Sequence, residues 1–494
     1  MAALDRRSAL ALAAALGLAS RPVAAAAGGA PFSWAWLQAR AARRAAAPYR
    51  RVPPVPDAAR IDYDAAGGIR FRAEAAIAGG IRLFPLTAMA PVPVAINVVE
   101  NGRARPVAFS SALFETRGAA AAHGFAGFRA ATPGRESDWM AFLGASYFRT
   151  AGSEDQYGLS ARGIAIDTGM AGAEEFPAFT DFWIERRGPA AWLIHALLDG
   201  PSVAGAFRFD CRLEDGVVQD VSSVLFFRKP VARLGIAPAT SMFWYGEARH
   251  PSATDWRPEI HDSDGLAIAT GSGERIWRPL ANPPRESIDS FADRNPRGFG
   301  LIQRDRDFAH YQDDGVFYER RPKLWVEPKG DWGAGAVSLF AFPTRGETDD
   351  NVVAFWTPAQ AVTRGARLAF DYRLTWSASD PARDAPSRAV AIRTGTAGRP
   401  GHAPVEGASK LVVDFQGDAL VGLGRDSGVT LSAGVARGRL LASAAYPVVG
   451  VRGLWRATLD VARGADAGAD PADVRLFLKQ GDRALSETIL VPVF

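Results

Sequence analysis

A chain of 494 residues is too long for one small domain and predicts about two to four domains, fewer if a large β-sandwich is present. The 50 glycines and 33 prolines, together with few long helical patterns, favour an all-β fold rich in turns. The formal charge of +4 is small for this length and no basic block stands out, which argues against nucleic acid as a partner. The single cysteine, Cys211, excludes an intrachain disulfide and is expected to be a small core residue.

The first 27 residues have the pattern of an export signal. The pair Arg6-Arg7 precedes an apolar run of Ala and Leu from Ala9 to Ala19, and small residues suitable for cleavage follow. This run is too short to span a membrane, so it predicts a signal peptide over 1–27. The paired arginines favour twin-arginine export, with the general secretory route as the alternative. We therefore expect a periplasmic protein, and no other segment is long and apolar enough to cross a membrane.

Short strands are predicted along most of the chain that follows. An amphipathic helix is expected over 32–49, and a short helical turn over 192–198. Elsewhere apolar residues alternate with polar ones, most clearly at 92–99, as in half-buried strands. Closely spaced hairpins without alternating helices predict a large antiparallel β-sandwich over 31–378.

The pattern changes toward the C-terminus. Residues 379–409 are rich in Ser, Ala, Pro, Gly and Arg without any period, which predicts a linker or a long surface loop. Residues 410–494 contain a series of short strand patterns and have about the size of an immunoglobulin-like sandwich. Few of their polar residues cluster, so we expect a structural or docking domain there.

Residues 248–356 mix carboxylates, arginines and large aromatic side chains with Gly and Pro, and show no periodic apolar pattern. Aromatic faces stack on sugar rings and charged planar groups hydrogen-bond to hydroxyls, so this stretch predicts a groove for a polar, uncharged, ring-shaped ligand such as a sugar polymer. Other chemistries lack their motifs, including glycine-rich phosphate loops and the Gly-x-Ser-x-Gly elbow. His261 has no second His or Cys at ligand spacing, so no metal is expected.

Carboxylates are the remaining candidates for catalysis in this stretch. Glycoside hydrolysis needs one protonated acid and one base, although each carboxylate taken alone is most simply a surface or turn residue. Residues 347–351 stand out because Glu347, Asp349, Asp350 and Asn351 crowd together directly before an apolar strand, where neighbouring charges raise carboxyl pKa values. Candidate contacts to a sugar are Trp244, Tyr245, Asp264, Arg275, Trp277, Arg304, Tyr311, Arg321 and Trp332.

Three long motifs carry a resemblance to a known family. They are His261-Asp262-Ser263-Asp264-Gly265-Leu266, Gly273-Glu274-Arg275-Ile276-Trp277-Arg278-Pro279-Leu280 and Asn295-Pro296-Arg297-Gly298-Phe299-Gly300-Leu301. With further motifs from residue 84 onward, they resemble the osmoregulated periplasmic glucan biosynthesis proteins G and D over nearly the whole chain. The twin-arginine pattern leans towards the D-type member.

The resemblance implies a fold and a reaction. The fold would be a large β-sandwich similar to the galactose mutarotase supersandwich, followed by an immunoglobulin-like domain. The reaction would be inverting endo-cleavage of β-1,2-glucan, with two alternatives left open: an anomer-inverting transglycosylase that cyclises the glucan, and a glucan-binding scaffold without catalysis. The implied partners are β-1,2-glucan and, as a further option, a membrane glucan synthase. No cofactor and no metal are implied, and the oligomeric state is left open.

The resemblance also assigns roles to individual residues. Asp350 falls on the general acid and Asp262 on the residue of the water-activating side. Glu347 and Tyr318 fall on supporting positions. Asp349 stands where the family often has Asn, and an extra charge beside the acid would raise the pKa of that acid.

Overall fold

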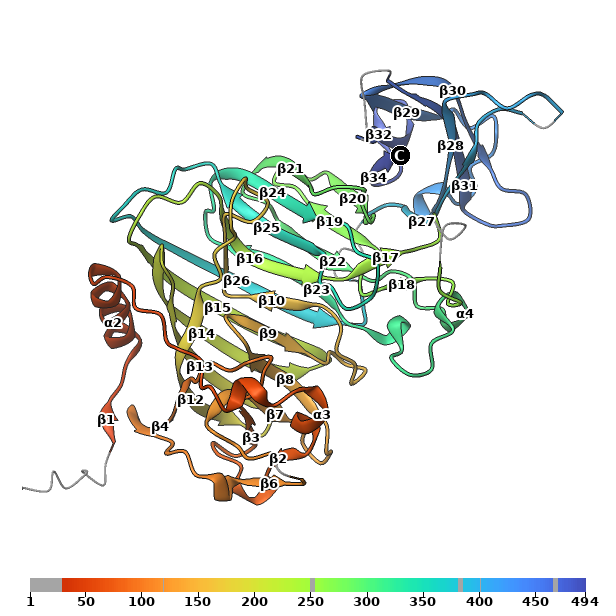
Figure 1. Ribbon diagram of the computed structural model, residues 1–494. Coiled ribbons are helices and arrows are strands. Elements are labelled where there is room, and N and C mark those ends of the chain that lie inside the picture. Colours follow the sequence, from red (N-terminus) through yellow and green to blue (C-terminus); the bar gives the residue numbers. More distant parts are fainter. Residues whose placement is uncertain (1–28, 119, 249–253, 381–384, 400, 465–469) are drawn as a thin grey trace, which may run out of the picture.

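The computed structural model describes residues 29–494 except 119, 249–253, 381–384, 400 and 465–469. The signal peptide expected over 1–27 lies outside these residues. The described chain is mostly β-structure, arranged as two large sheets and a smaller C-terminal unit (Figure 1). The expectation of an all-β sandwich fold is confirmed.

The larger sheet contains 16 strands within the described residues. In spatial order they are β1 (Ala30–Pro31), β5 (Arg103–Pro106), β4 (Ala95–Glu100), β12 (Ala178–Gly188), β13 (Ala191–Asp199), β14 (Val203–Glu214), β15 (Gly216–Phe227), β26 (Arg367–Ser377), β23 (Lys323–Lys329), β22 (Gly298–Ile302), β19 (Gly265–Ala269), β20 (Arg275–Pro279), β34 (Thr488–Val493), β32 (Ala472–Gln480) and β29 (Val429–Ala436), with β33 (Arg483–Ala484) beside β32.

The second sheet has ten strands in the same part of the chain. They are β21 (Ser287–Arg294), β24 (Ala334–Ala341), β25 (Val352–Pro358), β16 (Leu234–Ser241), β10 (Ser160–Arg162), β9 (Tyr147–Thr150), β8 (Asp138–Leu143), β7 (Phe125–Ala131) and β3 (Ile81–Pro85), with β11 (Ile164–Ile166) also pairing with β16. Two small ribbons accompany the sandwich: β2 (Ile69–Phe71) with β6 (Phe114–Thr116), and β17 (Phe243–Tyr245) with β18 (Ile260–His261).

The core of the sandwich is filled by side chains that face inward from both large sheets. Phe142 of β8 stacks on Phe128 and Phe148 at centroid distances of 5.0 and 5.1 Å, and meets Phe209 of the opposite sheet edge-to-face at 5.2 Å. Cys211 lies in the same cluster and is fully buried, as expected. Alternation along each strand thus joins the two sheets through one aromatic core.

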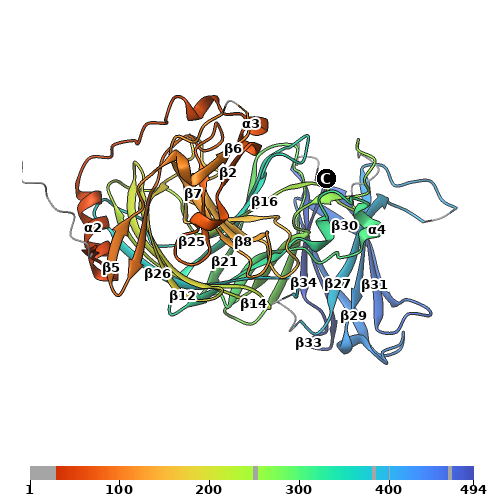
Figure 2. The ribbon, with the colours of Figure 1, turned by 90° about the horizontal axis from the view of Figure 1, so that it is seen from below.

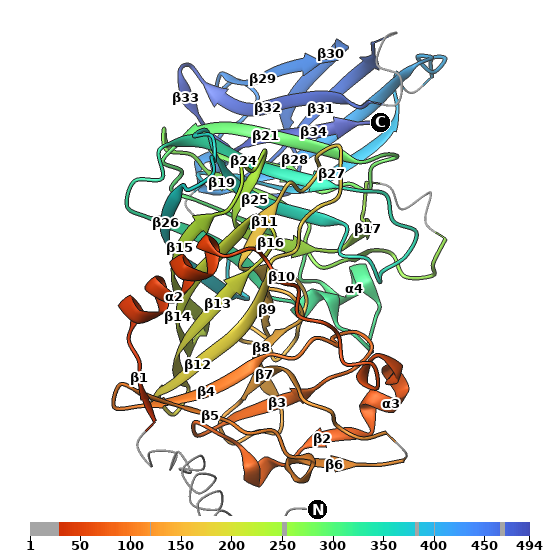
Figure 3. The ribbon, with the colours of Figure 1, turned by 60° about the vertical axis from the view of Figure 1, so that its left-hand side comes forward.

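Helices are few and short in the described chain. They are α2 (Trp34–Ala46), α3 (Tyr63–Gly67) and α4 (Phe308–Tyr311), with 3-10 turns at η1 (Ala58–Arg60), η2 (Ala73–Ala75), η3 (Ser111–Leu113), η5 (Tyr318–Arg320) and η6 (Asp418–Leu420). The expected N-terminal helix is confirmed as α2, which begins at the N-cap Ser33 and packs on the outer side of β13, β14 and β15 (Figure 3). None of these helices is long and apolar enough to cross a membrane.

The C-terminal unit is a second sandwich that continues the first. Its own four-stranded sheet consists of β27 (Arg388–Thr396), β28 (Ala408–Gln416), β31 (Leu454–Arg463) and β30 (Gly438–Pro447). Its other layer is the end of the 16-stranded sheet, because β34 pairs in parallel with β20 through Ile276↔Thr488 and Trp277↔Ile489. The unit lies on the side of the molecule away from α2 (Figure 2).

Two local expectations are wrong. Residues 192–198 belong to strand β13 rather than a helical turn, because an apolar run in a strand buried on both faces has no period that separates it from a helix. The segment 379–409 is not a continuous linker or surface loop, since it contains strand β27. The composition of β27 concealed this strand, because its Gly, Thr and Arg residues lie in a largely exposed segment.

Candidate active site

Asp262 and Arg321 form a buried ion pair beside strand β18. Asp262 follows β18 directly, where its backbone N–H donates to the carbonyl of Met242 at 2.9 Å. Nη1 of Arg321 contacts Oδ1 of Asp262, and the two side chains are only 13% and 7% exposed. The guanidinium also lies over the ring of Tyr318, with Cζ 3.9 Å from the ring centroid. Burial lowers the pKa of Arg321 to about 10, so it stays charged at neutral pH.

The segment before β10 allows this close packing. A Cβ added to Gly158 would lie 2.9 Å from the Cβ and Cδ atoms of Arg321. Any larger residue at position 158 would therefore push the Arg321 side chain out of place. A glycine more than 150 residues away in sequence thus helps to hold Arg321 against Asp262.

Glu347 is held by Arg257 and Tyr318. Arg257 donates to both carboxylate oxygens of Glu347, at 2.9 and 3.3 Å, and also to Asp313 at 2.7 Å. The Tyr318 hydroxyl donates a short hydrogen bond to Oε2 of Glu347. Burial alone would raise the pKa of Glu347, but the hydrogen bonds from Arg257 and Tyr318 outweigh it and hold that pKa below its usual range. Glu347 is therefore an ionised acceptor.

Asp350 lies next to an anchor that fixes its position. Asn351 is fully buried; its side-chain oxygen accepts from Phe243 N at 2.8 Å, and its amide nitrogen donates to the carbonyls of Phe243 and Phe342. This clamps the start of β25 to β17. Asp350 directly precedes the clamp, and its backbone position is therefore set by Asn351.

The pKa of Asp350 is shifted opposite to that of Glu347. Asp350 is exposed on one side, yet the protein packed on its other side removes enough water to raise its pKa. Positive charge on Arg149, Arg162 and Arg321 opposes this shift without reversing it, and Asp349 adds to it. Asp350 therefore holds its proton to a higher pH than an ordinary Asp, whereas Glu347 loses its proton early.

Six residues thus form one group, which we call the acid cluster: Asp262, Arg321, Tyr318, Glu347, Arg257 and Asp350. Arg321 links its two ends, since it contacts Asp262 directly and acts on Asp350 through its charge. Asp262, Tyr318, Glu347 and Asp350 were assigned to one site by resemblance, and Arg321 was a candidate contact. The structure joins Asp262, Arg321, Tyr318 and Glu347 through direct contacts, and it relates Asp350 to them through the charge of Arg321.

Three other candidate contacts line a separate cavity. This cavity has a volume of about 1260 Å³ and lies at the junction of the two sandwiches, where Asp264, Trp277 and Arg304 face residues 388–395 and 491–494. The acid cluster does not line it. Burial is the main cause that raises the pKa of Asp264 to about 6.

Arg304 joins the two units rather than pointing at a free surface. Its Nη1 and Nη2 donate to the two oxygens of buried Glu487 at 2.7 and 2.9 Å. Its guanidinium also stacks on Trp277, with Cζ 3.6 Å from the ring centroid. The arginine, the tryptophan and the glutamate therefore bind β22, β20 and the C-terminal unit together.

The remaining candidate contacts are either buried in the protein or only partly exposed. Trp332 is a core residue, packed edge-to-face on Phe370 and Tyr372, so its polar sequence context was misleading. Tyr245 and Tyr311 are buried, and Trp244 and Arg275 are partly exposed.

Sequence reasoning missed residues that the structure adds to the site. Arg257 could not be found from spacing, because its partners Asp313 and Glu347 lie 56 and 90 residues away. Trp256 beside it is 73% exposed, a rare state for a tryptophan. Its polar neighbours Asp255 and Arg257 gave no stronger signal than those of Trp332, so the sequence alone did not mark it as a stacking surface.

The fold and the site define a class of protein: an all-β protein of continuous sandwiches with an acidic polar site at which two carboxylates share one arginine. The chain matches the family described as "Periplasmic glucan biosynthesis protein, MdoG" over residues 32–493. It belongs to this family, as the sequence motifs indicated. Family membership gives it a role in periplasmic glucan biosynthesis, and the periplasm is the location that the family name states.

Named relatives are similar over almost their whole length. Glucans biosynthesis protein D 1 of Ralstonia nicotianae is 48% identical, over 93% of this chain and 91% of the relative. Glucans biosynthesis protein D 2 of the same organism and glucans biosynthesis protein D of Xanthomonas oryzae are each 44% identical, over 93% of this chain and 90% of the relative. These D-type names agree with the twin-arginine pattern, which favoured the D-type member of the family.

One solved structure gives a weaker match. A galactose mutarotase related enzyme from Lactobacillus acidophilus covers 52% of this chain and 92% of its own, at 12% identity and a TM-score of 0.23.

Proposed function

We propose that this protein cleaves β-1,2-linked glucan with inversion at the anomeric carbon. The observation that carries the proposal is that Arg321 contacts Asp262 and also acts through its charge on Asp350, an acid whose pKa burial raises. A glycosidase needs one carboxyl group that is still protonated when another is ionised. Asp350 is the carboxyl group that meets the first requirement.

In this proposal Asp350 donates its proton to the leaving glycosidic oxygen, and Asp262 accepts one from the attacking water. The proposal requires that Asp262, which contacts Arg321, and Asp350, on which Arg321 acts through its charge, lie apart on either side of the glycosidic bond. Inverting enzymes require such a separation, commonly about 6.5–9.5 Å, because the water must fit between base and sugar. The positive charge of Arg321 also offsets the negative charge of the acids while negative charge develops on the leaving oxygen.

Glu347 and Tyr318 have a positioning role in the proposal. The short hydrogen bond to Glu347 fixes the direction of the Tyr318 hydroxyl, and burial raises the pKa of Tyr318, so the hydroxyl keeps its proton. A fixed hydroxyl of this kind can donate to or accept from a sugar hydroxyl. Trp256, exposed next to Arg257, offers an apolar face on which a glucose ring can stack.

Two further functions use the same residues differently. If a glucan hydroxyl replaces water as the acceptor, the enzyme transfers or cyclises the chain; if no acceptor is activated, the protein is a glucan-binding scaffold. Purified protein incubated with linear β-1,2-glucan separates them by product mass and anomeric configuration. The proposal expects shorter linear products whose new reducing ends are α. Products lighter by one water would show cyclisation instead. Reducing ends in the β configuration would exclude inversion. Unchanged glucan would favour the glucan-binding scaffold without catalysis.

A further inference from the structure

A second group of polar side chains lies on the other face of β18, away from Asp262. Successive side chains of an extended strand point to opposite faces. Glu259 and His261 accordingly line the cavity between the two sandwiches, whereas Asp262 turns to Arg321 in the acid cluster. None of the steps proposed for glucan cleavage uses Glu259 or the residues around it.

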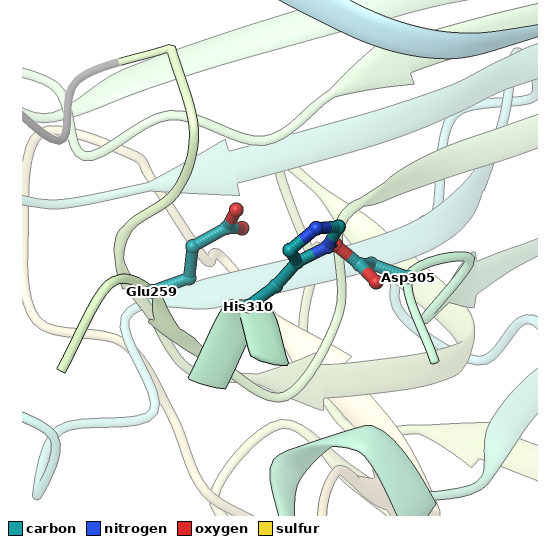
Figure 4. A group of neighbouring side chains, drawn as sticks. All are labelled: Glu259, Asp305 and His310. Atoms are coloured by element: carbon teal, nitrogen blue, oxygen red, sulfur yellow. The ribbon is translucent and has the colours of Figure 1, made fainter. Parts of the chain in front are cut away.

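Three of these residues converge on one point. Glu259, Asp305 after β22 and His310 of α4 each offer a ligand atom, and these atoms lie within 4.8 Å of one another. Figure 4 shows the three side chains, and all three residues line the cavity. Nδ1 of His310 lies 2.5 Å from Oδ2 of Asp305. The group thus joins elements that are 46 to 51 residues apart in sequence.

Glu259 is held for binding by a fixed set of hydrogen bonds. Gln303 donates through its amide nitrogen to the carbonyl of His261 and to Tyr311, which orients its amide oxygen toward Nδ1 of His261 at 3.0 Å. Nε2 of His261 then lies 2.9 Å from Oε2 of Glu259. Metal-binding carboxylates are commonly oriented by such outer hydrogen bonds.

Only one oxygen of the Glu259 carboxylate is engaged by His261. Glu259 is only 7% exposed, and among the described residues no hydrogen-bond donor reaches its Oε1. Two arginines that line the same cavity are engaged elsewhere, Arg304 with Glu487 and Arg306 with Glu154. Because Glu259 lines the cavity, a cation that enters the cavity can reach this carboxylate.

Space for an ion is built into the same place. The cavity beside it admits water to the remaining coordination positions. A donor set of one imidazole and two carboxylates favours zinc-type ions over magnesium and calcium. Magnesium and calcium favour ligands that offer oxygen alone.

We propose that Glu259, Asp305 and His310 bind a divalent transition-metal ion of the zinc type at the junction of the two sandwiches. This departs from the expectation of a chain without metal, which rested on the spacing of His261 in the sequence and on the family resemblance. The ion would tie β18 to the segment after β22 and to α4, and the site shares β18 with Asp262. The proposal stands independently of glucan cleavage.

Isothermal titration calorimetry tests the site directly when Zn²⁺ is added to the metal-stripped, tag-free protein. We expect one ion per chain, and at least about tenfold weaker binding for both His310→Ala and Asp305→Asn. His310 is 54% exposed, so its loss should not impair folding. His402→Ala, which removes an exposed histidine of the C-terminal unit, is the matched control and should bind as the wild type does.

Three results would overturn the proposal. They are no saturable binding of Zn²⁺, unchanged affinity in both site variants, and tighter binding of Mg²⁺ or Ca²⁺ than of Zn²⁺. Because binding is measured without glucan, its failure leaves the proposed cleavage untouched, and inactivity on glucan leaves the metal site untouched.

Discussion

Replacing Arg321 with methionine removes the guanidinium that contacts Asp262 while keeping a side chain of similar length. Asp262 is then a buried carboxylate without its ion-pair partner, and such a change costs about 3–5 kcal/mol of unfolding free energy. Asp262→Asn removes the negative charge instead. Arg321 keeps its position over the Tyr318 ring, so we expect a smaller cost of about 1–3 kcal/mol.

The double variant is the informative one. With both charges gone, no buried ion is left unpaired, so the two costs should not add. We expect the Arg321→Met/Asp262→Asn protein to be more stable than the sum of the single effects by about 2–3 kcal/mol. Urea unfolding followed by tryptophan fluorescence measures all four proteins of this cycle.

An exposed pair supplies the control for this cycle. Arg105 and Glu100 lie 3.0 Å apart on the β4–β5 hairpin and are 55% and 63% exposed, so their coupling should stay below about 1 kcal/mol. If the Arg321–Asp262 coupling is no larger than that of this exposed pair, the buried ion pair does not hold the site together. The placement of Asp262 in the acid cluster would then be wrong.

Two further perturbations test individual side chains. Because the folded-state pKa of Asp350 is raised, the stability tied to its protonated form is present at low pH and lost as pH rises through that pKa. Asp350→Asn should therefore raise the unfolding free energy at pH 7, by at most about 1 kcal/mol because the group is partly solvated. This gain should vanish near about pH 3. An equal gain at both pH values would contradict the raised pKa of Asp350. Trp332→Ala should cost about 3–5 kcal/mol of stability in urea unfolding, whereas Trp256→Ala should change it by less than about 0.5 kcal/mol yet weaken glucan binding several-fold. The reverse pattern would make Trp332 the sugar contact.

Much of the fold follows from local patterns in the sequence. Alternation at 92–99 corresponds to β4, and the N-terminal amphipathic pattern corresponds to α2. Pattern reasoning failed where tertiary burial overrides it, as at β13, whose apolar residues are covered on both faces by α2 and the opposite sheet. It also could not show that β34 pairs with β20, since a parallel contact between residues 276 and 488 leaves no local trace.

The site was predictable only in part for the same reason. Composition indicated a polar region, and resemblance selected Asp262 and Asp350, but no local pattern separates Trp332 in the core from exposed Trp256. Arg304 looked like a contact to ligand, although its role depends on Glu487 at the other end of the chain. Residues whose partners are distant in sequence require the fold before their function can be read.

The most direct test of the proposed function compares Asp350→Asn with Asp349→Asn on linear β-1,2-glucan. Both changes remove one carboxylate from adjacent positions, but only Asp350 is assigned as the acid. We predict that Asp350→Asn lowers the cleavage rate at least about a thousandfold while glucan binding persists. Asp349→Asn should keep activity, with the loss at high pH moved to lower pH because Asp349 helps to raise the pKa of Asp350. Cleavage by Asp350→Asn at the rate of the wild type would contradict the assignment.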